Sequence, residues 1–595
     1  MSMDERRQNI YEFGPFYLDT RERVLLRDGK PVPLKPKVYE TLLALISKSG
    51  HIVDKEELMR QVWPDVVVEE NNLTGNIFAL RRALAEHRYI ETVPRRGYRF
   101  TAEVRELQVE DVRVAGRQGA ETDVLIKEIV GTSGQAVDSL AVLPFVNAGA
   151  DPEAEYLSDG ITESIINNLS QLSQLRVMAR STVFRYKGLE SDWQEVGRRL
   201  GVRAVLLGRV LQFDERLIIR TELVDVKSGG QLWGQQYNRE LVDIFSVQDE
   251  IAREISEGLR LKLRAEEKRL LTKRYTENTE AYHAYLKGRY FWNKRTEGEL
   301  KKGIEYFQQA IDIDQRYALA YAGLADCYAV LGNFSFLSPE AAYPKAKAAA
   351  VKALEIDDTL PEAHTSLAWV KTQYDWDWAG AERKFKQAIA LNPDYTPAHY
   401  WYALFLSAMG RHDEAIAQAG HAHEIEPLSL LPNTVLGWTF YFARQYSEAV
   451  EQLRKTVEME PNFSFVRLLL GGAYEQVGMY YEAVAEFNAA VSGTGSRTQS
   501  LAGLGHGYAT SGRRGEAMEV LKELQEAQKR KYVAPFFMAL IYTGLGEKEQ
   551  AFAWFEKAYQ ARSWGLLWLK VDPRFDSLRS DSRFTDLLCR IGLVT

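Results

Sequence analysis

The stretch that decides the fold runs from residue 70 to residue 100 and reads ENNLTGNIFALRRALAEHRYIETVPRRGYRF. Its apolar residues Leu73, Ile77, Leu80 and Leu84 recur at the spacing of one helix face, which predicts an amphipathic helix over about residues 70–85. The following YIETVPRRGYRF has short apolar runs on either side of a turn near Arg95 to Gly97, and this pattern predicts a β-hairpin.

Positive charge is concentrated in the same stretch. Residues 81–100 contain six arginines and two glutamates, a balance of 6 − 2 = +4 in a chain whose net charge is −7. Binding to a phosphate backbone needs such a focused patch, and arginine is the residue best suited to forked phosphate and guanine contacts. The alternative interpretation is an ordinary solvated surface. The other side of the predicted helix is small and polar, which suits close approach to base edges (Asn72, Thr74, Gly75, Asn76, Ala79).

The residues before this stretch predict strands and then two more helices. YEFGPFYLDT and RVLLRDGKPVPL have β patterns, and Asp28-Gly29 favours a hairpin turn. A helix is expected to begin at Pro36 and stop at Gly50, and Asp54 is expected to cap a short helix that ends near Trp63. We therefore predict an α+β domain over residues 10–104.

This domain resembles the OmpR/PhoB-type winged-helix DNA-binding domain. The segments that carry the match are LKPKVYETLLALISKSGHIVDKEELMRQVWP, VEENNLTGNIFALRRAL and IETVPRRGYRF. The resemblance implies that the third helix enters the major groove of double-stranded DNA and that the hairpin, or wing, reaches the adjacent minor groove. It also implies that the loop from Pro64 to Glu70 contacts RNA polymerase. Carried over by position, the DNA-contacting residues are Asn72, Thr74, Gly75, Asn76 and Ala79 at the bases, Arg81 and Arg82 at phosphates, Arg96 at the wing tip and Arg99 in the minor groove. Phe78 and Ala79 depart from the family, which often has arginine at both positions.

Neither common control of the family is expected in this chain. About ten residues precede the winged helix, too few for a phospho-acceptor receiver domain, and residues 105–137 read as a polar linker where CadC-like regulators have a membrane helix. No signal peptide or apolar span is apparent, and Cys327 and Cys589 cannot make a disulfide framework. We expect a cytoplasmic protein without a membrane segment.

Residues 138–265 predict an α/β sandwich. SLAVLPFVN reads as a strand, GITESIINNLSQL and DWQEVGRRL as helices, and the segment from Ala204 to Trp233 as a β-meander. LAVLPF, YLSDGITESIINNLS and VLLGRV resemble the TolB amino-terminal-like domain, which implies no catalytic residue.

From residue 284 the sequence repeats with a period of 34 residues, the spacing between Ala381 and Ala415 and between Ala415 and Ala449. Alanine recurs at 381, 415, 449, 483, 517 and 551, and glycine at 410, 478, 512 and 546, with Arg444 in the missing position. Small residues let paired helices approach, and glycine makes the turn between them. The pattern resembles tetratricopeptide (TPR) repeats and implies an all-α superhelix of about eight copies over residues 284–565, followed by a capping helix in residues 566–595.

Four aromatic residues fall at positions of this repeat that line the groove of a TPR superhelix: Tyr400, Trp438, Tyr441 and Phe536. They are interpreted either as anchors for a protein or peptide partner or as the core between repeats, and both interpretations stay open.

The sequence offers no catalytic or metal-binding constellation and no cofactor motif. We therefore predict a multidomain transcription regulator that binds DNA and a protein partner, contacts RNA polymerase and is able to form a homo-oligomer. The competing hypothesis is a TPR scaffold or adaptor with incidental DNA binding.

Overall fold

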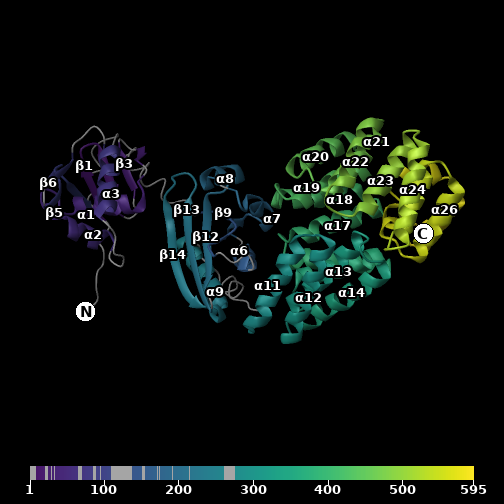
Figure 1. Ribbon diagram of the computed structural model, residues 1–595, viewed down its shortest axis with the longest axis horizontal. Coiled ribbons are helices and arrows are strands. Elements are labelled where there is room, and N and C mark those ends of the chain that lie inside the picture. Colours follow the sequence, from purple (N-terminus) through teal and green to yellow (C-terminus); the bar gives the residue numbers. More distant parts are fainter. Residues whose placement is uncertain are drawn as a thin grey trace.

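In the computed structural model the chain forms three parts that follow one another along its long axis (Figure 1). The structure describes residues 9–20, 24–27, 30–32, 34–63, 70–84, 89–93, 96–108, 137–149, 154–170, 172, 174–189, 192–213, 215–259 and 275–594. The N-terminal part is α+β, the middle part is built on a mixed sheet, and the C-terminal part is helical. The predicted fold class is confirmed.

The described residues of the N-terminal domain form two antiparallel sheets and three helices. The first sheet has the order β4-β3-β2-β1-β8, and the second has the order β5-β7-β6. The strands are β1 (Asn9–Phe13), β2 (Phe16–Asp19), β3 (Val24–Arg27), β4 (Lys30–Val32), β5 (Ile52–Asp54), β6 (Ile90–Val93), β7 (Gly97–Phe100) and β8 (Arg105–Gln108). The helices are α1 (Pro36–Ile46), α2 (Lys55–Val62) and α3 (Glu70–Ala83).

Strand β8 corrects the predicted linker. Residues 105–108 were expected to open a linker, but they pair antiparallel with β1, with Asn9 opposite Gln108 and Glu12 opposite Arg105. Strands pair through backbone groups, so a segment of polar composition can join the edge of β1, and that composition gave no sign of a strand. Residues 109–136 of the predicted linker lie outside the described residues.

The apolar helix face that the sequence predicts forms part of the core of this domain. Leu73, Ile77, Leu80 and Leu84 are each at most 2% exposed, and they pack with buried residues of α1 and of the second sheet. The Asp54 carboxylate accepts a hydrogen bond from the Glu56 backbone N–H at 2.8 Å and caps α2. Helix α3 is therefore fixed along its length by one apolar face, which leaves the opposite face to solvent.

The middle domain has a sheet with the order β11-β9-β12-β13-β14, in which β10 also pairs with β12. β9, β11 and β12 are parallel neighbours, whereas β12, β13 and β14 form the predicted antiparallel meander. The strands are β9 (Ser139–Val142), β10 (Val146–Asn147), β11 (Arg176–Val177), β12 (Ala204–Phe213), β13 (Arg216–Asp225) and β14 (Gln231–Glu240). The helices are α6 (Glu155–Leu169), α7 (Arg180–Val183), η2 (Phe184–Tyr186), α8 (Trp193–Leu200), η3 (Leu241–Asp243) and α9 (Ile244–Gly258).

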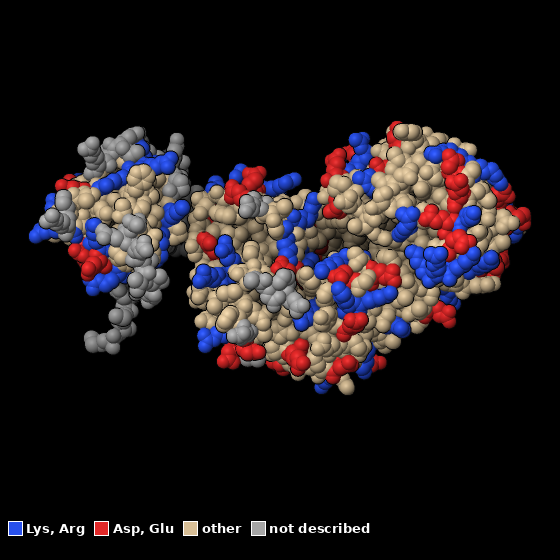
Figure 2. Space-filling model, in the orientation of Figure 1, with Lys and Arg blue, Asp and Glu red and all other residues tan. Residues whose placement is uncertain are grey.

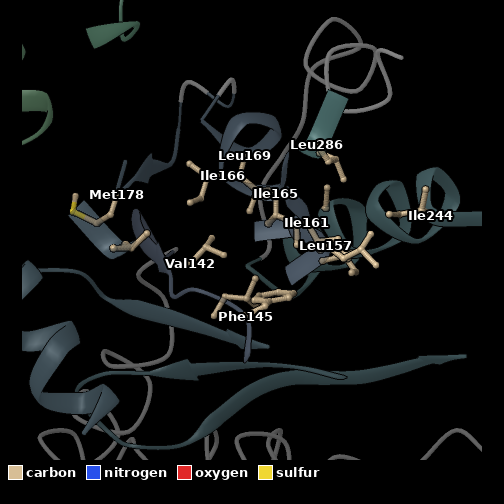
Figure 3. Close-up of a cluster of buried hydrophobic side chains, with 14 of the residues drawn as sticks. Val142, Phe145, Leu157, Ile161, Ile165, Ile166, Leu169, Met178, Ile244 and Leu286 are labelled. Atoms are coloured by element: carbon tan, nitrogen blue, oxygen red, sulfur yellow. The ribbon is translucent and has the colours of Figure 1, made fainter. Parts of the chain in front are cut away.

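Helix α6 carries the centre of the middle domain's core. Figure 3 shows buried side chains of this helix, including Ile161 and Ile165, in one cluster with Val142 of β9, Phe145 between β9 and β10, and Leu286 from the C-terminal part. Leu286 packs closely over Gly160, where an added Cβ would lie 2.8 Å from its methyl carbons. The middle domain and the first repeat helix therefore share one core.

A buried ion cluster joins the same two parts. The Glu163 carboxylate on α6 lies 2.7 Å from an Arg289 Nη2 of the first repeat helix and 2.8 Å from Arg180 Nε of α7. Burial alone would raise the pKa of Glu163, but the two guanidinium groups outweigh burial and hold this pKa below its ordinary value. The carboxylate is thus ionised at neutral pH and stabilises the junction, and this contribution is lost as the pH falls through the lowered pKa.

The C-terminal part is a stack of antiparallel helix pairs (Figure 1). Its sixteen helices, α11 to α26, make eight pairs over the described residues. The pairs are α11 (Thr279–Asn293) with α12 (Glu297–Ile313), α13 (Ala318–Asn333) with α14 (Pro339–Ile356), α15 (Pro361–Val370) with α16 (Trp378–Leu391), α17 (Thr396–Met409) with α18 (His412–Ile425), α19 (Leu430–Phe442) with α20 (Tyr446–Met459), α21 (Ser464–Gln476) with α22 (Tyr480–Ser492), α23 (Arg497–Thr510) with α24 (Arg514–Gln528), and α25 (Pro535–Gly544) with α26 (Lys548–Gln560). A π-helical turn, η4 (Lys371–Asp375), extends α15.

The 34-residue pattern has the structural basis that the sequence predicts. All six in-phase alanines are 0% exposed, at helix contacts. The four in-phase glycines have φ between +73° and +80°, and Arg444, in the missing glycine position, adopts φ +64°. A left-handed conformation is costly for a residue with a Cβ, but the Arg444 side chain makes an interaction that a glycine could not make.

That interaction comes from the C-terminal tail, residues 561–594. Arg444 forms a bidentate ion pair with Asp576, with N–O distances of 2.7 and 2.9 Å. The tail contains η5 (Trp564–Trp568), η6 (Pro573–Leu578) and α27 (Ser582–Arg590). It was predicted as a capping helix over the last repeat, but it also reaches repeats far back in the chain. Lys570 Nζ donates to the Met409 carbonyl at 2.9 Å, and Trp378 Nε1 donates to the Ile591 carbonyl at 3.1 Å.

No helix in the described part of the chain is long and apolar enough to cross a membrane.

Candidate nucleic-acid interface

The exposed face of α3 carries four of the nine residues predicted to contact DNA. Asn72, Thr74, Gly75 and Arg82 are exposed on it, opposite the buried apolar stripe, whereas Ala79 is half-buried. The space beside Gly75 is open, because nothing lies within 4 Å of the position that a Cβ would occupy. Packing within the domain therefore does not require a glycine at this helical position, although glycine costs a helix about 1 kcal/mol relative to alanine.

Asn76 was expected to face bases, and the structure gives it another role. Its Nδ2 donates to the Lys37 carbonyl and to the Thr41 hydroxyl, both at 3.0 Å, so the side chain lies against α1 and is half-buried. On a helix, residue 76 lies next to the buried Ile77 and Leu73 and not beside Thr74 and Arg82. Asn76 therefore positions α3 on α1.

We expect Asn76→Ala to lower the free energy of unfolding by about 1 kcal/mol, because two hydrogen bonds to α1 are lost. The sequence preference of the protein for DNA should not change. Urea unfolding and a selection of bound sequences from a random pool measure the two effects. A preference altered at one base pair would return Asn76 to the base-contacting set.

Arg81 was expected to contact phosphate, and the structure uses it to hold the wing. Its Nε and Nη2 donate to the Ile90 carbonyl at 3.2 and 3.0 Å, and Nη2 donates to the Thr92 hydroxyl at 2.6 Å. The guanidinium thus joins the end of α3 to strand β6. Its five donors in a fixed fork allow this double attachment, which a sequence pattern does not reveal.

The wing is the hairpin of β6 and β7. Arg96 is exposed at its turn, where its backbone N–H donates to the Val93 carbonyl at 3.1 Å. Gly97 follows with φ +153°, and an added Cβ would lie 2.0 Å from the Val53 carbonyl oxygen, so only glycine lets β7 approach β5 here. Arg99 lies further back on β7, opposite Glu91, and its Nη1 is 3.7 Å from that carboxylate.

Lys and Arg side chains are interspersed with Asp and Glu over the face of the molecule shown in Figure 2, including the N-terminal domain. On this face, positive charge therefore does not form one continuous basic surface. The loop expected to contact RNA polymerase lies outside the described residues for 64–69, as do residues 94–95 of the wing.

Phe78 is the residue of this face that the sequence-based prediction left out. It is 71% exposed, on the same side of α3 as Thr74 and Arg82. The available signal was an aromatic residue outside the apolar stripe of the helix.

The four aromatic residues predicted as groove anchors are covered. Tyr400, Trp438, Tyr441 and Phe536 are 7%, 6%, 3% and 3% exposed. Trp438 packs on Trp568 of the tail with ring centroids 4.5 Å apart, and the Tyr441 hydroxyl donates to Asp572 at 3.0 Å. The cavity left between repeats and tail is about 60 Å³, well below the roughly 150 Å³ that holds a benzene molecule. The tail thus covers Trp438 and Tyr441, and Phe536 contacts Phe575 of the tail with ring centroids 5.7 Å apart, which favours the core interpretation for these three residues.

Comparison with known proteins follows the three-part division. Residues 29–100 match the family described as "Transcriptional regulatory protein, C terminal", and residues 135–257 match "HilA/YgeH-like transcriptional regulator, second domain". Residues 377–427, 434–497 and 536–563 match tetratricopeptide repeat families. The transcriptional regulator HilA of Salmonella typhimurium is 26% identical over 592 residues, which cover 96% of this chain and 98% of HilA.

This chain is a HilA- and CadC-like DNA-binding transcriptional regulator with TPR repeats. The transcriptional activator CadC of Escherichia coli is 28% identical over 102 residues, which cover 16% of this chain and 20% of CadC. The solved DNA-binding domain of CadC is 26% identical, with a TM-score of 0.16, and covers 17% of this chain and all of that domain.

A putative adenylate cyclase of Rhizobium meliloti is 37% identical over 241 residues, but the match covers 39% of this chain and 40% of the cyclase. The full-length similarity is to a regulator, which confirms the prediction of a non-enzymatic protein. The middle domain is HilA-like, and its resemblance to TolB amino-terminal domains stays a prediction.

Proposed function

We propose that the protein binds specific operator sequences, with α3 in the major groove and the wing in the adjacent minor groove. The observation that carries this proposal is the exposed face of α3, which combines an arginine in the last turn with a glycine whose surroundings are open. A major groove about 12 Å wide admits such a helix, and a small residue lets the helix backbone approach the bases. In this proposal Arg82 and Arg96, which are both exposed, contact phosphates, and Arg99 contacts the minor groove.

The substitution Gly75→Leu should change the affinity for DNA without lowering the stability of the domain. Because the space beside Gly75 is open and leucine favours helices, we expect stability to stay the same or to rise by up to about 1 kcal/mol. The leucine side chain should nevertheless block close approach and lower affinity for a bound sequence by at least about tenfold, comparable to one misfitted base pair.

Mobility shifts with the full chain at two salt concentrations, on genomic promoter fragments and on random DNA, measure this effect. Gly515→Leu is a matched control, since Gly515 lies in α24 of the repeats and also has nothing within 4 Å of its Cβ position. Equal binding of random and promoter DNA, with no response to Gly75→Leu, would favour the scaffold hypothesis.

We also propose a protein partner for the repeats, since TPR stacks are extended binding surfaces. The covered aromatic residues are not available to it while the tail is in place. An apolar surface that is available is the turn between α21 and α22, where Val477, Met479, Tyr480 and Tyr481 are 42%, 39%, 44% and 87% exposed. Contact of the loop 64–70 with RNA polymerase and self-association on paired half-sites belong to the same proposal and rest on the winged-helix resemblance. A cytoplasmic location is also proposed, from the two distant cysteines and the polar N-terminal segment.

A further inference from the structure

Phe78 is an apolar side chain on a surface that is otherwise polar. Within the described part of the N-terminal domain it is the one large hydrophobic residue among those exposed, at 71%. A phenyl ring left in water forgoes roughly 1.5–3 kcal/mol that burial would provide. The domain core is already filled by the opposite side of α3, so the fold itself does not use this ring.

The position of Phe78 on α3 places it between two other residues of the DNA-facing surface. Thr74 lies four residues before it and Arg82 four residues after it, so the three side chains follow one line along the helix. If Arg82 contacts phosphate at the edge of the groove, the ring of Phe78 lies one turn closer to the base edges.

The chemistry of a phenyl ring limits what it recognises there. It has no hydrogen-bond donor or acceptor, so it does not read the polar edges of guanine, adenine or cytosine. The apolar group that the major groove presents is the C5-methyl of thymine. We propose that Phe78 is a specificity-determining residue that packs on a thymine methyl group of the operator. This proposal rests on the proposed placement of α3 in the major groove.

The experiment removes the methyl group alone. A bound sequence is first selected with the full chain, and each dT in it is then replaced by dU in turn. The wild-type protein should lose about fourfold in affinity at one thymine of each half-site, the value expected when one buried methyl group is removed. Phe78→Ala should be insensitive to that replacement while keeping the responses to other base changes. Because the ring is exposed, the variant should unfold at the same urea concentration as the wild type.

Phe213→Ala is the matched control, since Phe213 is 68% exposed but lies at the end of β12 in the middle domain. It should respond to dU as the wild type does. The inference is overturned if Phe78→Ala keeps the full sensitivity to dU, or if it weakens dT and dU fragments equally. Selective binding with no dU-sensitive position would also overturn it while leaving the proposed function intact, whereas failure to select any sequence would contradict the proposed function.

Discussion

Trp568→Ala should destabilise the repeat domain by about 3–5 kcal/mol, the usual cost of replacing a large buried aromatic residue. Trp568 is 2% exposed, and its ring lies 4.5 Å from that of Trp438 and 4.8 Å from that of Phe442, with which it is stacked. The substitution therefore removes two ring contacts of the tail with α19. Urea unfolding followed by helical circular dichroism measures the loss.

Trp554→Ala provides the comparison. Trp554, on α26, is half-buried, with the Lys557 ammonium 3.9 Å from its ring centroid, and its loss should cost less than half as much. Limited proteolysis should release the tail from Trp568→Ala but not from Trp554→Ala. If the two variants are equally stable, the tail does not hold the stack as described.

Replacing Arg82 and Arg96 together with alanine should weaken DNA binding on the order of 100-fold at moderate salt, since each loses a charge-assisted contact worth roughly 1.5–3 kcal/mol. The slope of log affinity against log salt should become shallower by about 2, because two phosphates are no longer neutralised. Both residues are exposed, so stability should be nearly unchanged.

The control for this double variant removes the same charge elsewhere. Arg198, 61% exposed on α8, and Arg513, 46% exposed before α24, lie outside the N-terminal domain. Their double alanine variant should bind DNA as the wild type does. A slope that is unchanged in the Arg82 and Arg96 variant would remove these residues from the phosphate contacts.

The helix pattern and the repeat period are the parts of the structure that local sequence predicts well. Leu73, Ile77, Leu80 and Leu84 are buried because a period near 3.6 leaves one apolar face. The six in-phase alanines are buried because every repeat makes the same helix contact. Even the exception, Arg444, was visible as a missing glycine in the repeat.

What the sequence could not supply were contacts between distant segments. The roles of Asn76 and Arg81 depend on the carbonyl groups of Lys37 and Ile90, whose positions follow from the packing of α1 and β6. In the same way, the repeat pattern places Tyr441 in the groove, but it does not show that Asp572, 131 positions later, accepts a hydrogen bond from the Tyr441 hydroxyl. A side-chain periodicity shows which face of a helix is apolar, but not which segment covers it.

The central claim is that α3 reads operator DNA. The most direct measurement is genome-wide mapping of the DNA bound by the full chain, compared with that bound by the Gly75→Leu variant expressed at the same level. The account predicts a limited set of promoter fragments with a common sequence for the wild type, and loss of that enrichment for the variant, while the variant unfolds at the same urea concentration as the wild type or at a higher one. Binding spread without a common sequence, or enrichment that persists in the variant, would contradict it.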